Sequence, residues 1–168
     1  MPEKAKPQKH GFCTFLLDDK RYAIDILTVQ EVNRQLRITP VHGAPEYVLG
    51  LLNLRGQIVN VVDTKCALGL GRMDVTPESR QLVLKTNADL RTRGCEDLCT
   101  SEDLIGLLVD RVSDVIDVDE GRIEDPPPAL AKREGTVVLG VVQLDGEILR
   151  ILDPSRLLVF ETELAQLP

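Results

Sequence analysis

Two aspartates have the residue type and the repeated placement that acid–base chemistry could use. Asp63 and Asp153 each end an aliphatic run, and two carboxylates can share proton transfer in catalysis. Each also directly precedes a short segment that is expected to be helical, "TKCAL" after Asp63 and "PSRLL" after Asp153. An aspartate there accepts hydrogen bonds from the first amide groups of a helix, and proline is favoured at the next position. Because both occur at the same structural point, we predict helix N-caps rather than catalytic acids.

Two cysteines, Cys95 and Cys99, lie in the acidic segment "GCEDLCTSED". Their spacing differs from the close pairs of zinc ribbons, and a structural zinc needs about four ligands. The two histidines, His10 and His42, are distant from them in sequence. We predict an acidic surface loop over residues 87–103, with a zinc site and a disulfide as the less favoured alternatives. Cys13 and Cys66 lie among apolar residues and are expected in the core.

The remaining composition favours a binding module over an enzyme. The sequence has no phosphate-binding glycine loop, no paired metal-binding histidines and no nucleophile elbow. A net charge of -7 with 3 Phe, 2 Tyr and no Trp lacks the cationic surface and stacking platforms of nucleic-acid binding. No apolar run approaches the ~20 residues of a membrane span, and the polar N-terminus is unlike a secretory signal. We therefore expect a cytoplasmic protein with reduced cysteines, no cofactor and no metal.

Short aliphatic runs separated by turn residues predict the elements that must position these residues. The runs "FCTFLL", "RYAIDIL", "RQLVLKT", "LIGLLVDRV" and "VIDV" are typical of short strands. The segment "TVQEVNRQLRITPV" could continue a strand or turn briefly helical. The prolines of "EDPPPALAKREG" predict a loop, since proline cannot donate to a sheet ladder. This pattern favours small barrels or a sandwich over a parallel α/β sheet.

An internal repeat divides the chain. The segment "GLLNLRGQIVNVVDTKCAL" from Gly50 aligns without a gap with "GVVQLDGEILRILDPSRLL" from Gly140, over 19 positions. A weaker echo relates "VQEV", residues 29–32, to "VSDV", residues 112–115. The chain is therefore expected to form two similar lobes, each built around one hairpin.

The two predicted hairpin tips differ in charge. Arg55-Gly56 stands at the first and Asp145-Gly146 at the second. Glycine at the second position tolerates the positive φ that a tight hairpin requires. Asp-Gly is the usual turn dipeptide and Arg-Gly is not, which points to a role for Arg55 beyond the turn. The alternative is a solvated arginine without a role.

These motifs in this order resemble the CheW-like coupling proteins of bacterial chemotaxis. The resemblance rests on "YAIDI", "VQEV", "NLRG", "IGLLVDRVSDV", "PPP" and the final hairpin, and covers residues 12–158. It implies an all-β fold of two five-stranded antiparallel SH3-like barrel lobes with short helices, a shared core and a groove between them. We expect a flexible tail over residues 1–10, a CheW-like domain over 11–160 with lobes at 16–79 and 80–158, and a C-terminal tail over 161–168.

The resemblance also implies a function. Proteins of this family are non-catalytic adaptors that couple the cytoplasmic tip of a methyl-accepting chemoreceptor to the regulatory domain of a histidine kinase. The chain would then be cytoplasmic and recruited to membrane-associated receptor arrays, without inserting into the membrane. Two alternatives remain: an adaptor of a related gliding, pilus or developmental pathway, and a ligand-binding or enzymatic small barrel.

Residue by residue, the resemblance implies that Arg55 pairs with Glu31. It places Val29 and Val32 on one wall of the groove that receives a receptor hairpin, and Val112 and Val115 on the other. Plain core packing is the alternative for each valine. The implied partner-binding residues are Val29, Glu31, Val32, Gly50, Asn53, Leu54, Arg55, Gly56, Val112 and Val115.

Three features depart from the family pattern. Asn60 stands where the family often has proline, so the strand edge there could pair differently. Thr64 stands where leucine is usual, and the acidic loop with Cys95 and Cys99 is longer. These departures bear on the choice of partner more than on the fold.

Overall fold

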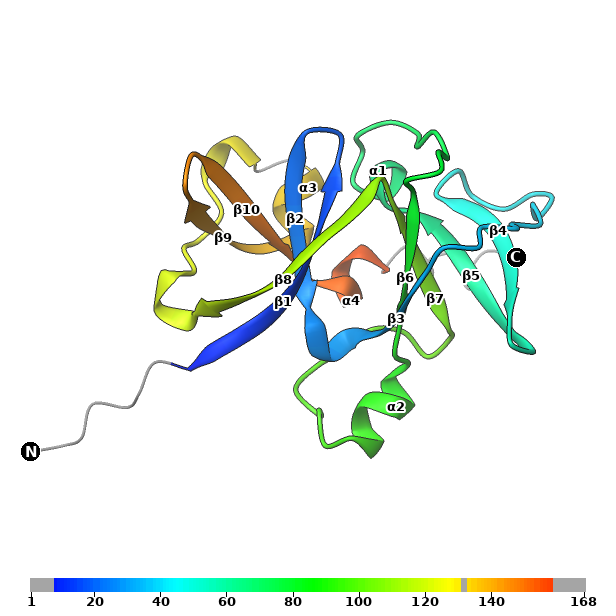
Figure 1. Cartoon of the computed structure of the whole chain (residues 1–168), viewed down its shortest axis with the longest axis horizontal. Helices are drawn as coiled ribbons and strands as arrows, with labels where there is room; N and C mark the ends of the chain where they lie inside the picture. The colour runs from blue at the N-terminus through cyan, green and yellow to red at the C-terminus, as the bar shows by residue number, and fades with distance from the viewer. Residues whose placement is uncertain (1–7, 131–132, 159–168) are drawn as a thin grey trace, which may run out of the picture.

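Ten short strands dominate the described part of the protein, residues 8–130 and 133–158 of a computed structural model (Figure 1). The strands are β1 (Lys9–Leu17), β2 (Lys20–Asp25), β3 (Val29–Asn33), β4 (Val48–Leu54), β5 (Gln57–Asp63), β6 (Arg80–Leu84), β7 (Ile105–Val109), β8 (Arg111–Asp119), β9 (Val138–Leu144) and β10 (Glu147–Leu152). The α-helices are α1 (Thr64–Ala67), α2 (Asn87–Thr92), α3 (Arg133–Val137) and α4 (Pro154–Leu157), and the 3-10 turns are η1 (Ile26–Thr28), η2 (Glu120–Arg122) and η3 (Pro128–Leu130).

The strands form two five-stranded sheets. Sheet A has the order β8-β1-β2-β10-β9 and lies on the left of Figure 1, and sheet B has the order β3-β6-β7-β5-β4 and lies on the right. This arrangement confirms the predicted all-β class with two five-stranded lobes. The pairing is not wholly antiparallel, because β10 runs parallel to β2 and β5 runs parallel to β7. In each parallel pair, β2 with β10 and β5 with β7, the two strands are separated in the chain by a long connection, because a tight turn can join only antiparallel strands.

The predicted lobe boundaries, 16–79 and 80–158, are wrong. β3 follows β2 in the chain but pairs with β6 of sheet B, and β8 follows β7 but pairs with β1 of sheet A. Sheet B therefore takes its strands from residues 29–109, and sheet A combines residues 9–25 with 111–152. The repeat marks two halves of the chain, and each sheet mixes strands from both halves.

Two further segments differ from their predictions. Lys9 and His10, expected in the N-terminal tail, begin β1 opposite Asp119 and Val118. The predicted acidic loop, residues 87–103, begins instead with α2, whose N-cap Thr86 accepts a hydrogen bond from the Asp89 amide. A six-residue helix is too short to show a clear apolar period in the sequence. The predicted tails at 1–7 and 161–168 lie outside the described residues.

One core is shared by both sheets, as the resemblance implies. Phe15 and Tyr22 of sheet A stack with ring centroids 6.0 Å apart, and they belong to the same apolar cluster as Leu82 and Leu107 of sheet B. A smaller cluster around Phe12 fills sheet A alone. Among the described helices, none combines the length and the apolar character needed to cross a bilayer. The packed interior therefore ties the two lobes into one unit.

Polar contacts fasten the short helices to the sheets. The Tyr22 hydroxyl donates a hydrogen bond to Glu134 of α3 over 2.5 Å, and burial followed by this contact raises the pKa of Tyr22. Lys65 of α1 donates to Asp18 in the β1–β2 turn over 2.6 Å, and this hydrogen bond raises the pKa of Lys65. Because α1 directly follows β5 of sheet B and Asp18 lies between β1 and β2 of sheet A, the contact of Lys65 with Asp18 links the two lobes.

Candidate partner-binding site

The β4–β5 hairpin ends in a two-residue loop, Arg55-Gly56. Arg55 has a φ of 51° and Gly56 a φ of 84°, so both lie in the left-handed region that a type I′ turn requires. Asn53 holds the turn, because its Oδ1 accepts a hydrogen bond from the Gly56 amide over 2.9 Å. Leu54 pairs with Gln57 across the loop. The predicted turn is confirmed, with the addition that an arginine occupies a backbone conformation uncommon for it.

Arg55 and Glu31 form an ion pair, as the resemblance implies. Nη2 of Arg55 donates a hydrogen bond to Oε2 of Glu31 on β3. The Arg55 side chain is 72% exposed and that of Glu31 is 26% exposed. Because β3 is the outer strand at the far side of sheet B from β4, the pair joins the hairpin tip to the opposite edge of a curled sheet. It keeps a cation at the surface in a fixed position.

Gly50 and the aspartate caps set the base of this hairpin. A Cβ on Gly50, which has a φ of 148°, would lie 2.2 Å from the Thr39 carbonyl oxygen. That approach lets Thr39 and Leu51 exchange two backbone hydrogen bonds, of 2.7 and 2.8 Å. At the end of β5, the Asp63 carboxylate accepts from the amides of Cys66 and Met73 over 3.0 and 2.9 Å.

The structure also places Asp153, the other predicted N-cap, and Asn60, which stands where the family often has proline. Asp153 accepts hydrogen bonds from the amide and the hydroxyl of Ser155 over 3.0 and 2.6 Å. Both aspartates are therefore N-caps, as predicted. Asn60 lies on β5, an interior strand between β7 and β4, and its amide donates to the Leu104 carbonyl over 2.9 Å. The donor that proline would lack is used in the sheet.

The weaker sequence echo is matched by strand register. On β3 the three-residue step from Val29 to Val32 faces a two-residue step on β6. On β8 the step from Val112 to Val115 faces a two-residue step on β1. The same bulge therefore occurs in both outer strands, which identifies β3 and β8 as equivalent elements of the repeat.

A hollow of about 450 Å³ lies between the two sheets and brings together Val32 of β3 and Val112 of β8. Val32 is 44% exposed and Val112 is half-buried. Val29, also half-buried, packs against the shared core, and Val115 is 59% exposed farther along β8; neither lines the hollow. The hollow thus contains one of the two predicted valines from each wall. Its lining is Val32, Arg34, Glu78, Arg80, Arg111 and Val112.

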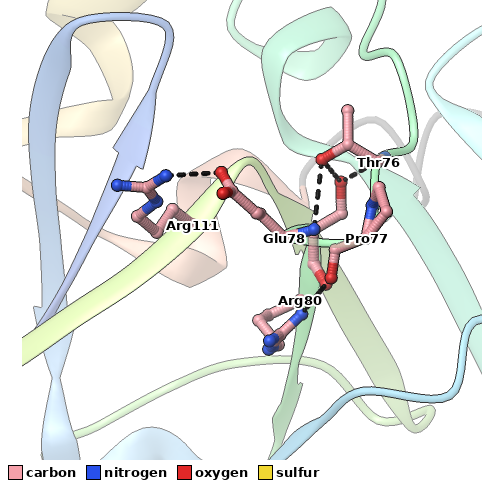
Figure 2. Close-up of polar contacts among 6 residues, drawn as sticks. Thr76, Pro77, Glu78, Arg80 and Arg111 are labelled. Atoms are coloured by element: carbon pink, nitrogen blue, oxygen red, sulfur yellow. Dashed lines mark hydrogen bonds and ion pairs between the residues drawn. The ribbon is translucent and has the colours of Figure 1, made fainter.

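Charged residues that the sequence reasoning missed line the hollow together with these valines. Figure 2 shows three of them, Glu78, Arg80 and Arg111. Nη2 of Arg111 donates to Oε2 of Glu78, and this hydrogen bond, followed by the positive charge of Arg111, lowers the pKa of Glu78. The same contact raises the pKa of Arg111. Arg80 donates to the carbonyls of Pro77 and Ser79, each over 2.8 Å. Arg111 could have been inferred from its neighbour Val112, but no sequence signal links Glu78 to the hollow.

The cysteines and acidic residues show no metal centre in the described ranges, where no group of three or more His, Cys, Asp or Glu side chains could hold an ion. Cys95 is half-buried, Cys99 is exposed and both are free thiols. Cys13 is buried as predicted, and burial raises its pKa, whereas Cys66 is only half-buried. The hollow itself is thus lined by two valines, three arginines and one carboxylate.

Comparison with known proteins identifies the family. A family model described as the CheW-like domain matches residues 11–161. The chemotaxis protein CheW of Bacillus subtilis is 28% identical over 92% of this chain and 90% of its own length. Protein FrzA of Myxococcus xanthus is 27% identical over 92% of this chain and 88% of its own. The crystal structure of the scaffolding protein TtCheW from Thermoanaerobacter tengcongensis superposes with a TM-score of 0.71 at 30% identity, covering 86% of this chain and 89% of that one.

The two sheets and the hollow between them make this protein a two-lobed β scaffold. The chain belongs to the CheW-like domain family. It is a non-catalytic chemotaxis adaptor, as its relatives named for chemotaxis and its scaffolding neighbour indicate. This family membership excludes the alternative of an enzymatic small barrel.

Proposed function

We propose that the chain couples the cytoplasmic tip of a methyl-accepting chemoreceptor to the regulatory domain of a histidine kinase, with the receptor's helical hairpin bound in the interlobe hollow. The observation that carries this proposal is the position of Val32 and Val112. These valines come from different sheets and line one hollow. An amphipathic helix binds by laying its apolar side chains into a groove of this kind. Recruitment of the chain to receptor arrays would follow from this contact.

The β4–β5 tip offers a second contact for the kinase. Arg55 is 72% exposed and is held by Glu31, and neither residue lines the hollow. A cation fixed by its neighbour loses less side-chain freedom when a partner binds it. The two partners can therefore be assigned to separate surfaces, which a coupling protein requires.

The substitution Val32→Arg tests the groove. A long charged side chain in the hollow should weaken binding of a purified chemoreceptor cytoplasmic fragment by at least about tenfold, and should leave binding of the kinase regulatory domain within about twofold of the wild type. Both affinities are measured by isothermal titration calorimetry. Val41→Arg is the matched control, because Val41 is 42% exposed, close to the 44% of Val32, and lies outside the hollow.

The outcomes separate clearly. If receptor binding is unchanged in Val32→Arg, the groove proposal is wrong. If receptor and kinase binding disappear together while circular dichroism still shows a folded protein, the assignment of the partners to separate surfaces is wrong.

An adaptor of a related pathway is the second candidate. It is favoured by the match to protein FrzA, which extends over 92% of this chain at an identity similar to that of the CheW relatives. Pairwise titration against each CheW-like kinase regulatory domain encoded in the same genome distinguishes the candidates. Tight binding to a kinase outside the chemotaxis cluster would favour the second.

A further inference from the structure

We infer that Glu78 occupies, in the free protein, the position of a carboxylate on the partner helix. The hollow then selects a helix that carries an acidic residue beside its apolar ridge, and Arg111 exchanges Glu78 for that residue on binding. This inference rests on the proposed function, since it names the chemistry of the helix that enters the groove.

The charge of the hollow is opposite to that of the whole chain. The chain carries a net charge of -7, yet the hollow is lined by Arg34, Arg80 and Arg111 against the single carboxylate of Glu78. Arg34 is exposed and forms no ion pair with any residue in the described ranges. Complementary charge steers an acidic segment to such a surface and sets its orientation.

The Arg111–Glu78 pair is easily exchanged. The side chains are 55% and 64% exposed, and ion pairs in that environment are weak because water and salt compete with them. Arg111 begins β8 of sheet A, whereas Glu78 precedes β6 of sheet B, so the pair spans the hollow between the two sheets. A helix that contacts Val32 and Val112 would meet this pair.

The backbone around Glu78 is held without its carboxylate. The Thr76 amide donates to Oγ of Ser79 over 2.9 Å, and the Ser79 amide donates to the Thr76 carbonyl over 3.0 Å. Arg80 donates to the Pro77 and Ser79 carbonyls, and Figure 2 shows its guanidinium beside Pro77. The Glu78 side chain can therefore leave Arg111 while the turn that carries it keeps its shape.

Glu78→Gln tests the inference, with the same purified chemoreceptor fragment as the probe. Removing the internal competitor should tighten binding by about three- to tenfold and increase its salt dependence. Glu46→Gln is the matched control, because Glu46 forms an exposed ion pair with Arg72 outside the hollow, and the substitution changes the net charge equally. This control should bind like the wild type.

A double substitution sharpens the test. Arg111→Gln should weaken binding by about tenfold, and Glu78→Gln should give no further gain in that background, because Glu78 acts through Arg111. If Val32→Arg blocks binding but Glu78→Gln binds like the wild type or more weakly, this inference is wrong and the groove proposal stands. If Val32→Arg has no effect on binding, both fail.

Discussion

The two repeated hairpins share a scaffold and differ at their tips. The β4–β5 tip carries Arg55, whose partner Glu31 lies on β3, the outer strand of sheet B that corresponds to β8 of sheet A. In the other lobe the corresponding positions are Asp145 at the tip and Asp114 on β8. Two carboxylates cannot form an ion pair, so the cationic tip is specific to sheet B. The internal repeat therefore accounts for the shared backbone of the two hairpins, and the charge of the tip distinguishes one lobe from the other.

The shared scaffold extends to individual hydrogen bonds. Thr39 bridges to the residue after Gly50, and Glu124 bridges to the residue after Gly140 through two hydrogen bonds of 2.8 Å. The Asp63 amide donates to the Tyr47 carbonyl over 2.7 Å. In the other hairpin, the Asp153 amide donates to the carbonyl of Val137, the residue equivalent to Tyr47 in the repeat, over 2.9 Å. These contacts depend on the backbone, which is why the repeat keeps them while side chains at the tips diverge.

The largest expected difference between the lobes is at the two glycines. Gly50→Ala should lower the free energy of unfolding by more than about 4 kcal/mol, since its Cβ would overlap the Thr39 carbonyl and its φ is positive. Gly140→Ala should cost less, about 2–3 kcal/mol, because its φ is not in the left-handed region and its Cβ would lie 2.6 Å from a methyl of Ile123 and 2.9 Å from the Glu124 carbonyl oxygen, a looser approach than at Gly50. Urea denaturation followed by circular dichroism measures both. Equal costs would show that the two bridges are equally tight.

A smaller difference is expected at the two caps. Asp63→Ala should cost about 3 kcal/mol, because it removes the cap of α1 and leaves the Met73 amide without its acceptor in the interior. Asp153→Ala should cost about 1 kcal/mol, since its carboxylate is less buried and caps α4 alone. Thermal unfolding of the variants ranks them. The reverse order would contradict the burial argument.

The smallest effect on stability, and the sharpest on function, is expected at the tips. Arg55→Asp gives the first tip the charge of the second and should change stability by less than about 1 kcal/mol, because the pair is exposed. Binding of the kinase regulatory domain should weaken by about tenfold. The reciprocal Asp145→Arg should leave both quantities near those of the wild type. Unchanged binding in Arg55→Asp would remove the functional reading of the tip, and unfolding would make Arg55 structural.

The local features of the fold could be predicted from the amino-acid sequence. The alternation of aliphatic runs with turn residues predicts strands such as β1, β2, β6 and β7. Arg55-Gly56 predicts a tight turn, and Asp63 and Asp153 predict caps, because each depends on backbone geometry within a few residues. The pairing of Arg55 with Glu31 came from family resemblance, since the two residues are 24 positions apart.

The pairing of strands into sheets, and the contacts between distant side chains, became apparent from the three-dimensional structure. The β1–β2 hairpin shares a sheet with β8, β9 and β10 of the other half of the chain, and β6 and β7 share one with β3, β4 and β5. No local pattern in the sequence distinguishes this exchange from two contiguous lobes. The same exchange brings Val32, Val112 and Arg111 together, and it places Glu78 against Arg111 across 33 positions of sequence. Hairpins and caps are set by short-range hydrogen bonds, whereas the hollow depends on long-range packing that closes only when the whole core forms.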